Sequence, residues 1–328
     1  MSDDWNVLVT EPIDEAGLVK LEAFADVTRW DEYEADADEY GADARLPADI
    51  ERYHAIVVRT SPIDADAIAR ADALRVIAKH GVGVDNVALE AASERNVPVG
   101  NLPGVNTQEV AEHALALLVG VRKTLLSTNE ALKEGSWDRS ACRSRTVKGD
   151  TLGLFGFGHA GQTLAEMANG LGLSCVAYDP YVTDAELPLH VTGVETKRAL
   201  FETADCVSVH TPLTPETRGA IGREELRALP DTGIVVNTAR GGIIDEEALE
   251  VALENDELAG AGLDVFTDEP PAPDHPLVNR SDVIATPHIA GTTVEALRRM
   301  SLGAAETVRR VHDGKLPTST VNESSLER

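Results

Sequence analysis

Residues 150–161 have the sequence Asp-Thr-Leu-Gly-Leu-Phe-Gly-Phe-Gly-His-Ala-Gly. The pattern predicts a short apolar strand that runs straight into Gly-x-Gly-x-x-Gly, followed by a helix from Gln162 to about Gly170. In the dinucleotide-binding fold Gly156 permits the tight turn, Gly158 lets the backbone approach a pyrophosphate, and Gly161 lets the helix pack close to the strand. The free N–H groups at the start of that helix would then face the phosphates. The stretch therefore predicts a dinucleotide site almost halfway along the chain.

An acidic residue follows at the expected distance. A second strand, Ser174 to Tyr178, ends in Asp179, which lies 21 positions after Gly158. At this spacing a carboxylate accepts hydrogen bonds from the adenosine ribose and repels a 2′-phosphate. Pro180 and Tyr181 come next, with no arginine that could bind such a phosphate. We therefore expect NAD as the cofactor, in preference to NADP.

Length and composition indicate a chain of two ordinary domains. The 328 residues are 43% hydrophobic, and no apolar run is long enough to cross a bilayer. Residues 1–4 lack the basic and apolar pattern of a signal peptide. The cysteines are odd in number and scattered, which indicates reduced thiols without a disulfide framework, a catalytic cysteine or a metal site: Cys142, Cys175 and Cys206. We expect a cytoplasmic protein with no membrane partner and no metal.

The charge is extreme. The chain has 29 basic and 56 acidic residues, a formal net charge of -27 and a pI of about 4.6. Such a field repels nucleic acid, so no nucleic-acid partner is expected. Dispersed acidic residues also repel one another at low salt, and concentrated salt screens that cost. The hypothesis is a protein from a high-salt cytoplasm; the alternative is an ordinary acidic protein.

The order of predicted elements gives an α/β fold with two doubly wound parallel sheets. In the first hundred residues, strands alternate with helices (strands 6–10, 26–29, 55–59, 76–79 and 97–100; helices 14–23, 65–71 and 87–94). One long helix, from Gln108 to about Leu132, should carry the chain into the unit that holds the fingerprint. Later strands of that unit are expected at 205–210, 233–238, 262–266 and 283–286. The last helix, 293–311, is expected to return to the first unit, with a cleft between the two.

Polar groups follow several of these strands. Ligands of doubly wound sheets bind beyond the carboxyl ends of the strands. In the second unit these ends are occupied by residues 210–212, 237–242, Asp264 with Glu269, and 286–291. In the first unit, Lys79 to Asn86 follows a strand, and its glycines would expose N–H groups able to hold a carboxylate.

Together these segments resemble the D-isomer-specific 2-hydroxyacid dehydrogenases over essentially the whole chain. The resemblance is carried by the fingerprint and by five further segments in the same order: Gly81–Asn86, Val110–His113, Asn237–Gly241, Gly262–Phe266 with Asp268–Pro270, and Pro287–Gly291. It implies two flavodoxin/Rossmann-like domains, with residues 104–292 as the NAD-binding domain. That domain would be inserted into a substrate domain of residues 1–103 and 293–328. The resemblance also implies a homodimer and an enzyme that acts on a small 2-hydroxy or 2-keto acid.

The resemblance assigns the chemistry to three residues. His288 would be the acid/base, Glu269 its carboxylate partner and Arg240 the substrate anchor. An imidazole can take the hydroxyl proton while a hydride leaves carbon, and a neighbouring carboxylate stabilises the imidazolium. Arginine can fork onto a carboxylate without losing its charge. The alternatives are a structural histidine, a surface ion pair for Arg240, and the adjacent Asp268 in place of Glu269.

The expected cofactor contacts come from the fingerprint and the strand ends. We expect NAD to be bound by Thr107, Gly156, Gly158, His159, Ala160, Gly161, Asp179, His210, Thr211, Pro212, Thr217, Thr238, Ala239, Asp264 and Gly291. Asp264 is expected to position the nicotinamide amide. His210 and His113 are expected to be supporting groups, and His80 could face the substrate.

The substrate half of the site is expected in the first unit. Arg59, Lys79, Val82 and Gly83 are predicted to bind the substrate together with Arg240 and His288. In the phosphoglycerate dehydrogenases, basic residues at the positions of Arg59 and Lys79 bind the substrate phosphate, which favours 3-phosphoglycerate. The alternatives are a surface ion pair and a glyoxylate, hydroxypyruvate or broader 2-keto acid reductase.

Two further expectations concern regulation and a different class of function. The sequence stops at Arg328, so the serine-binding regulatory domain of longer relatives is not expected. An NAD-sensing corepressor is the alternative outside enzymes. The intact set of Arg240, Glu269 and His288 argues against it.

Overall fold

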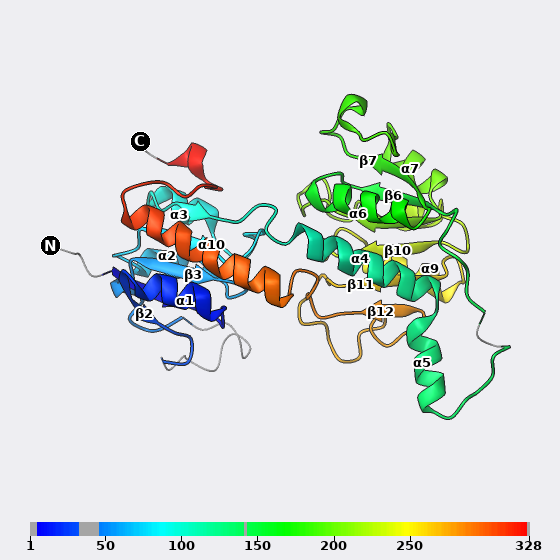
Figure 1. Cartoon of the computed structure of the whole chain (residues 1–328), viewed down its shortest axis with the longest axis horizontal. Helices are drawn as coiled ribbons and strands as arrows, with labels where there is room; N and C mark the ends of the chain where they lie inside the picture. Colours follow the sequence, from blue (N-terminus) through cyan, green and yellow to red (C-terminus); the bar gives the residue numbers. More distant parts are fainter. Residues whose placement is uncertain (1–4, 33–45, 141–142, 327–328) are drawn as a thin grey trace. The chain divides into compact units, whose positions relative to one another are not determined.

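The computed structural model describes residues 5–32, 46–140 and 143–326. Its contacts divide the chain into two compact units, Met1–Asn106 with Thr292–Arg328, and Thr107–Gly291 (Figure 1). The sequence placed the first boundary between residues 103 and 104. The structure places it at Thr107, because the helix that begins there packs wholly with the second unit. The second boundary differs by one residue.

The first unit is built on a five-stranded parallel sheet of order β2-β1-β3-β4-β5. Its strands are β1 (Trp5–Val9), β2 (Ala25–Thr28), β3 (Ala55–Val58), β4 (Val76–Lys79) and β5 (Val99–Gly100). Its helices are α1 (Glu15–Glu22), α2 (Ala65–Arg70), α3 (Leu89–Glu94) and α10 (Val294–His312), with short 3-10 turns at Ile50–Arg52 and Glu323–Ser325. All residues of β3 and β4 are buried, as expected for central strands covered on both faces.

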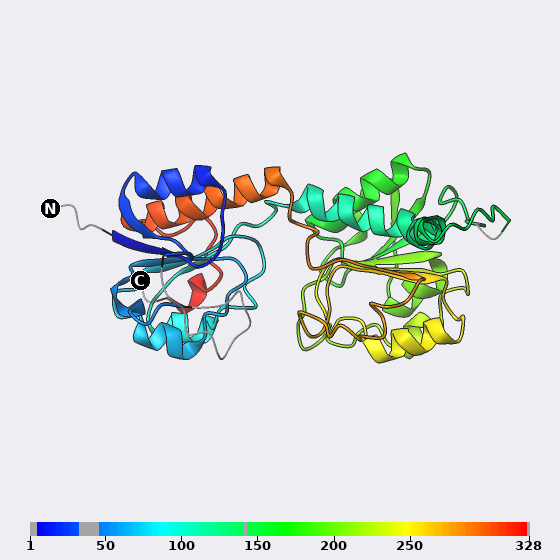
Figure 2. The same cartoon turned by 90° about the horizontal axis from the view of Figure 1, so that it is seen from below.

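Helices cover both faces of this sheet. One apolar core joins the sheet to α1 and α10, and the other joins it to α2 and α3 (Figure 2). Helix α10 begins with Thr293, whose side chain caps the N–H of Ala296, and it lies against α1. Helix α10, from the C-terminal part of the chain, therefore completes the core of the unit that contains the N-terminal strands.

The second unit is built on a seven-stranded parallel sheet of order β12-β11-β10-β9-β6-β7-β8. Its strands are β6 (Thr151–Phe155), β7 (Ser174–Tyr178), β8 (Val191–Gly193), β9 (Cys206–Val209), β10 (Ile234–Asn237), β11 (Gly260–Leu263) and β12 (Val283–Ala285). Its helices are α4 (Thr107–Arg122), α5 (Leu125–Lys133), α6 (His159–Gly170), α7 (Lys197–Thr203), α8 (Arg223–Leu226) and α9 (Glu246–Glu254), with a 3-10 turn at Asp184–Glu186. One core joins the sheet to α4 and α6 and the other to α7, α8 and α9. The parallel α/β class expected from the sequence is confirmed in both units.

The predicted single helix over residues 108–132 was wrong. The structure has two helices, α4 and α5, separated at Thr124, whose φ of 50° is left-handed. Val121 and Leu125 keep the helical spacing of apolar residues across the break, so periodicity alone does not reveal it. Helix α5 has no buried residue. Strand β8 was also missed, because three residues at a sheet edge give almost no pattern.

Across the described ranges, none of the helices has both the length and the apolar character that a bilayer span requires. Cys175 and Cys206 are free and buried, and Cys142 lies outside the described residues. The described side chains also contain no group of three metal ligands.

Candidate active site

The glycine loop between β6 and α6 has a distinct structural reason for each glycine. Gly156 has a φ of +96°, and a Cβ there would lie 2.8 Å from the carbonyl of His210. A Cβ on Gly161 would lie 2.7 Å from the oxygen of Gly156, so the helix can pack this closely only without a side chain. At Gly158 an added Cβ would meet no atom within 4 Å. The loop is thus tight at both ends and open in the middle.

The surroundings of this opening fit a dinucleotide. Gly158 caps the twelve-residue helix α6 without a side-chain hydrogen bond, so His159 and Ala160 begin the helix with N–H groups that no side chain caps. Such N–H groups and the helix dipole favour phosphate. At the end of β10, the buried hydroxyl of Thr238 has no hydrogen-bond partner among the described residues. A buried polar atom left in this state indicates a missing ligand or water.

Asp179 connects the glycine loop to the end of β7. One carboxylate oxygen accepts the N–H of Phe157 at 2.8 Å, and the other accepts the N–H of Tyr181 at 2.9 Å. A carboxylate can accept about four hydrogen bonds, so capacity is left for two ribose hydroxyls. The structure therefore holds this acid at the loop where the sequence placed it.

His210 and Thr217 shape the loop after β9. Burial lowers the pKa of His210 to about 4, and its Nε2 lies 2.8 Å from the hydroxyl of Ser208. The imidazole is therefore neutral. Thr217 donates to the carbonyl of Pro212 at 2.7 Å and closes the loop on itself. Its hydroxyl is committed to the loop, so its part in cofactor binding would be indirect. The remaining expected cofactor residues in this unit lie at the start of α4 or in the loops after strands β9, β10 and β12, and are partly buried: Thr107, Thr211, Ala239 and Gly291.

Arg240 follows β10 in a turn that Asn237 organises. The Asn237 side chain accepts the N–H of Ala239 at 3.0 Å and donates to the carbonyl of Arg240 at 2.8 Å. The next residue, Gly241, lies so close to the chain after β11 that a Cβ would overlap the Phe266 carbonyl and lie 2.5 Å from the N of Thr267. This close approach brings Arg240 near enough to Glu269 for its charge to lower the pKa of that carboxyl.

His288 and Glu269 form a direct pair. Nδ1 of His288 lies 2.7 Å from Oε2 of Glu269, and both side chains are partly exposed, at 49% and 37%. The other oxygen of Glu269 accepts the N–H of Phe266 at 3.1 Å. Burial raises the pKa of Glu269, but the hydrogen bonds and charges of His288, Phe266 and Arg240 outweigh it, so the pKa lies below its usual value. Glu269 is therefore ionised at neutral pH, and Nε2 of His288 is left for a substrate.

Asp264 holds the segment that carries His288. Its buried carboxylate accepts the Thr286 hydroxyl at 2.6 Å and the N–H groups of Ile289 and Ala290 at 2.9 and 2.8 Å. His113 lies 3.5 Å from the same carboxylate and 2.9 Å from the Thr286 hydroxyl. Burial raises the pKa of Asp264, but these hydrogen bonds lower it further than burial raises it.

This network changes the expected role of Asp264. The sequence suggested a contact with the nicotinamide amide, but the carboxylate is fully buried and its oxygens face the backbone after β12. His288 has a left-handed φ of 52°, which is unfavourable for a residue with a Cβ. Asp264 stabilises that conformation and so positions the histidine.

In the first unit, Arg59 and Lys79 differ in exposure. Arg59 is partly exposed, and its guanidinium donates to the Thr292 hydroxyl at 3.3 Å. Lys79 is buried at 8% exposure, and its ammonium donates to the carbonyl of Arg59 and to the side-chain oxygen of Asn86 at 2.6 Å. The predicted direct phosphate contact of Lys79 is therefore not supported. Lys79 ties the Arg59 loop to the glycine-containing loop after β4.

Three residues that follow Lys79 bear on further expectations, and one of them corrects an expectation. His80 is 2% exposed, and its Nε2 lies 2.9 Å from the Ser301 hydroxyl of α10, so it belongs to the core and does not face a substrate. Val82 and Gly83 lie at least partly exposed on the loop after β4, where the carbonyl of Val82 accepts the Asn101 side chain at 2.8 Å. These two backbone positions are accessible to a ligand.

Glu11, which lies just after β1, was not predicted to have a role near the site. Its buried carboxylate accepts the N–H groups of Arg59, Thr60 and Ser61, although these residues are 48 to 50 positions away. One acid among 56 acidic residues gives no signal of such a role. The only available hint was its position directly after a strand.

Comparisons with known proteins show the family to which the chain belongs. The model of the family "D-isomer specific 2-hydroxyacid dehydrogenase, NAD binding domain" matches residues 115–290. The chain is 36% identical over 322 residues to a D-3-phosphoglycerate dehydrogenase of Archaeoglobus fulgidus, and this match covers 98% of the chain and 60% of the relative. It is also 36% identical to a glyoxylate reductase of Korarchaeum cryptofilum, over 98% of the chain and 97% of the relative.

A solved structure gives the same result. An NADPH-dependent glyoxylate/hydroxypyruvate reductase of Sinorhizobium meliloti, in complex with NADP and malonate, superimposes with a TM-score of 0.85 at 29% identity and 99% coverage of both chains. The chain thus spans about three fifths of the archaeal phosphoglycerate dehydrogenase and nearly all of the two reductases. The family model and the length of these matches show that the chain belongs to the D-isomer specific 2-hydroxyacid dehydrogenase family.

Proposed function

We propose that the protein is an NAD-dependent oxidoreductase that transfers a hydride between nicotinamide and a D-2-hydroxy acid or its 2-keto acid. The observation that carries this proposal is the pair of His288 and Glu269, with Nδ1 2.7 Å from Oε2 and Arg240 close enough to influence Glu269. These groups follow strands β10, β11 and β12, at the same edge of the sheet as the glycine loop after β6. Family membership supports the reaction class.

The residues divide the work of the reaction. Nicotinamide, when bound, accepts or supplies the hydride. In the oxidising direction, Nε2 of His288 takes the hydroxyl proton, and ionised Glu269 stabilises the imidazolium that results. In the reducing direction, the same imidazolium donates its proton to the carbonyl oxygen. Arg240 binds the substrate carboxylate and polarises the carbonyl.

The role of His288 can be tested by deletion of the imidazole. His288→Ala should lower kcat by a factor of about 100 or more, because the general acid/base is lost. NAD affinity, measured by titration of intrinsic fluorescence, should remain within about twofold. His275→Ala is a suitable comparison, since this histidine pairs with Glu246 in the same unit. Undiminished turnover of the His288 variant would contradict the assigned role. A wild-type protein that binds NAD without any turnover would favour a binding function such as that of a corepressor.

We propose NAD in preference to NADP because of Asp179. Its carboxylate lies at the end of β7 and is held there by the N–H groups of Phe157 and Tyr181. A 2′-phosphate would meet this negative charge, whereas ribose hydroxyls can donate to it. Asp179→Ser should therefore reduce the ratio of kcat/KM for NADH over NADPH.

We propose 3-phosphoglycerate as the substrate, with its phosphate bound by Arg59. The partly exposed guanidinium of Arg59 supports this role, as does the similarity to phosphoglycerate dehydrogenases. A reductase acting on glyoxylate or hydroxypyruvate is the second candidate, since two relatives that match this chain along nearly their whole length carry those names.

A matched pair of substrates separates the two candidates. 3-Phosphohydroxypyruvate and hydroxypyruvate differ only by the phosphoryl group, so the ratio of their KM values reports on phosphate recognition. Arg59→Ala should raise the KM for the phosphorylated acid about tenfold or more relative to the other. Arg70→Ala removes the same charge from the exposed surface of α2 and should leave the ratio unchanged. A wild-type preference for hydroxypyruvate would favour the reductase.

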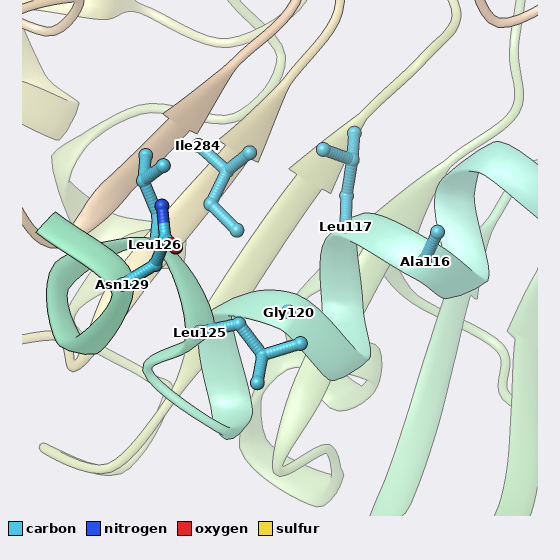
Figure 3. A pocket seen from close by; sticks show the side chains of 7 residues that line it. All are labelled: Ala116, Leu117, Gly120, Leu125, Leu126, Asn129 and Ile284. Carbon is cyan, nitrogen blue, oxygen red and sulfur yellow. The ribbon is translucent and has the colours of Figure 1, made fainter. Parts of the chain in front are cut away.

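We also propose a homodimer formed through the segment that begins with α5. This helix has no buried residue, yet it presents exposed Leu125, Leu126 and Leu132, and Trp137 follows at 79% exposure. Beside it is an apolar groove of about 460 Å³ between α4, α5 and β12, lined by Leu117, Gly120 and Ile284 among others (Figure 3). Exposed apolar surface of this kind marks an association site.

Charge indicates a second copy of the chain as the partner. Between Lys123 and Lys148 there are six basic and three acidic residues, whereas the whole chain has a net charge of -27. A locally positive segment on an acidic protein is complementary to the acidic surface of another copy. Light scattering in molar KCl should give the mass of a dimer. Leu125→Ser with Leu126→Ser should give a monomer, and Leu189→Ser, at an exposed leucine elsewhere, should not. A monomeric wild type would contradict the proposal.

The place of action that we propose is a cytoplasm of high salt. The two buried free thiols are compatible with a reducing compartment, and the net charge is compatible with concentrated salt.

A further inference from the structure

Glu11 follows β1, and its buried carboxylate is surrounded by the loop that follows β3. It is 7% exposed, and its carboxylate accepts the N–H of Arg59 at 2.9 Å, the N–H of Thr60 at 2.6 Å and the N–H of Ser61. The hydroxyls of Thr60 and Ser61 donate to the same carboxylate at 3.0 and 2.8 Å, and that of Thr10 also donates. Three consecutive backbone N–H groups thus converge on one side chain.

The carbonyl groups of this loop are also held by hydrogen bonds. Lys79 donates to the carbonyl of Arg59, and the Asn86 side chain donates to the carbonyl of Ser61 at 2.6 Å. Lys79 and Asn86 are themselves joined at 2.6 Å. The backbone of residues 59–61 is therefore fixed by a buried anion on its N–H side and by a buried cation and an amide on its C=O side.

The carboxylate is charged in this position. Burial raises the pKa of Glu11, but the hydrogen bonds from Thr10, Arg59 and Ser61 lower it by more, and the result lies below the usual value. Charge-assisted hydrogen bonds are the strongest of those available to a backbone N–H. The loop conformation therefore depends on the negative charge as well as on the shape of the side chain.

This arrangement has a consequence for ligands. Three adjacent N–H groups of this kind would otherwise form a site for an external anion. Because Glu11 fills them, these N–H groups are not available to an anionic ligand, whereas the partly exposed side chain of Arg59 still carries a positive charge.

We propose that Glu11 is a positioning residue for substrate specificity, which holds the Arg59 loop so that the guanidinium meets the distal anionic group of the substrate. This inference rests on the proposed role of Arg59. Glu11 does not touch the substrate, and its effect passes through Arg59.

The test uses the KM ratio of 3-phosphohydroxypyruvate to hydroxypyruvate in Glu11→Gln, Arg59→Ala and the double variant, at one fixed salt concentration. In Glu11→Gln the side-chain NH2 faces N–H donors, so the loop should shift. A displacement of about 1 Å at a binding group is enough for a large loss, and the ratio should rise about tenfold. Since Glu11 acts through Arg59, the double variant should equal Arg59→Ala.

Two further variants separate positioning from general damage. Glu11→Asp keeps the charge and should bring the KM ratio part of the way back to the wild-type value. If Glu11→Gln does not fold, Glu11→Asp replaces it in the test. Glu15→Gln removes one charge from the exposed start of α1 and should behave as wild type. NAD affinity is the internal check that the second unit is intact in every variant.

The possible outcomes are distinct. If Arg59→Ala raises the ratio and Glu11→Gln does not, or raises both KM values equally, the Glu11 proposal is overturned. It is also overturned if the two effects add in the double variant. If Arg59→Ala leaves the ratio unchanged, the proposed phosphate role of Arg59 is wrong, and the Glu11 proposal falls with it.

Discussion

Gly241 provides the sharpest test of the site geometry, because the perturbation is a single methyl group. In Gly241→Ala the new Cβ would overlap the Phe266 carbonyl and lie 2.5 Å from the N of Thr267. An ordinary contact requires at least 3.4 Å, so the chain at residues 266–267 must move by about 1 Å or more. The new methyl group would clash with backbone atoms, so no neighbouring side chain can rotate to relieve the clash.

The movement should reach the proposed catalytic groups directly. Phe266 donates its N–H to Glu269 at 3.1 Å, and Glu269 in turn holds His288 at 2.7 Å. Misplacement of a catalytic group by about 1 Å costs on the order of 100-fold, and overpacking of this kind destabilises a protein by about 1–3 kcal/mol. We therefore expect kcat/KM to fall about 100-fold while the protein still folds.

The assay compares steady-state kinetics with NAD binding and thermal unfolding. NAD affinity should change by less than the rate, since the glycine loop after β6 lies on other strands. Gly170→Ala is the matched control, because an added Cβ at the end of α6 meets no atom within 4 Å. A Gly241→Ala enzyme with kcat/KM within twofold of wild type would refute the close approach of the two loops.

Three other predictions concern Asp264, His80 and the net charge. Asp264→Asn should reduce kcat tenfold or more, because the two N–H groups that hold the His288 segment bind different carboxylate oxygens and the NH2 of asparagine would face one of them; a loss of stability with unchanged kcat would contradict this. Burial, with a smaller effect from the Arg59 charge, lowers the pKa of His80 from 6.5 to about 4. Between these pH values the unfolded chain binds the proton and the folded protein does not, so stability falls as pH falls, by up to about 1.4 kcal/mol per pH unit. Urea titrations of His80→Asn should show a smaller slope in this window, and an identical slope would refute the assignment. Finally, a chain of net charge -27 should lose thermal stability on transfer from molar KCl to low salt, and a Tm indifferent to salt would rule out the high-salt hypothesis.

Much of the architecture could be predicted because it depends on local pattern. Strands buried on both faces, such as β3, β9 and β10, are short apolar runs, and their alternation with helices predicts a parallel sheet. The break between α4 and α5 escaped because Thr124 has a left-handed backbone while the apolar spacing continues through it. The edge strand β8 escaped because it has only three residues.

The candidate site was also only partly predictable from the sequence. His288, Glu269 and Arg240 could be proposed from the sequence because the family resemblance assigns them, and each follows a strand at the edge of the sheet where parallel strands end. The direction in which each of the side chains points could not be predicted from the sequence. Lys79 looked like a phosphate ligand, but its ammonium points into the protein, and Asp264 looked like a cofactor contact but holds backbone N–H groups.

The sequence by itself determined the two parallel α/β units, the cofactor loop and the strand ends at which the reactive groups are proposed. These follow from hydrophobic period and from glycines at fixed spacing, which are properties of neighbouring residues. Only the tertiary structure decided which polar groups form hydrogen bonds inside the protein and are therefore not available to a ligand. Glu11 meets residues about 50 positions away, and Gly241 touches a loop 25 positions further on. Such contacts depend on how the whole sheet packs, and a buried charge takes whichever partners that packing leaves for it.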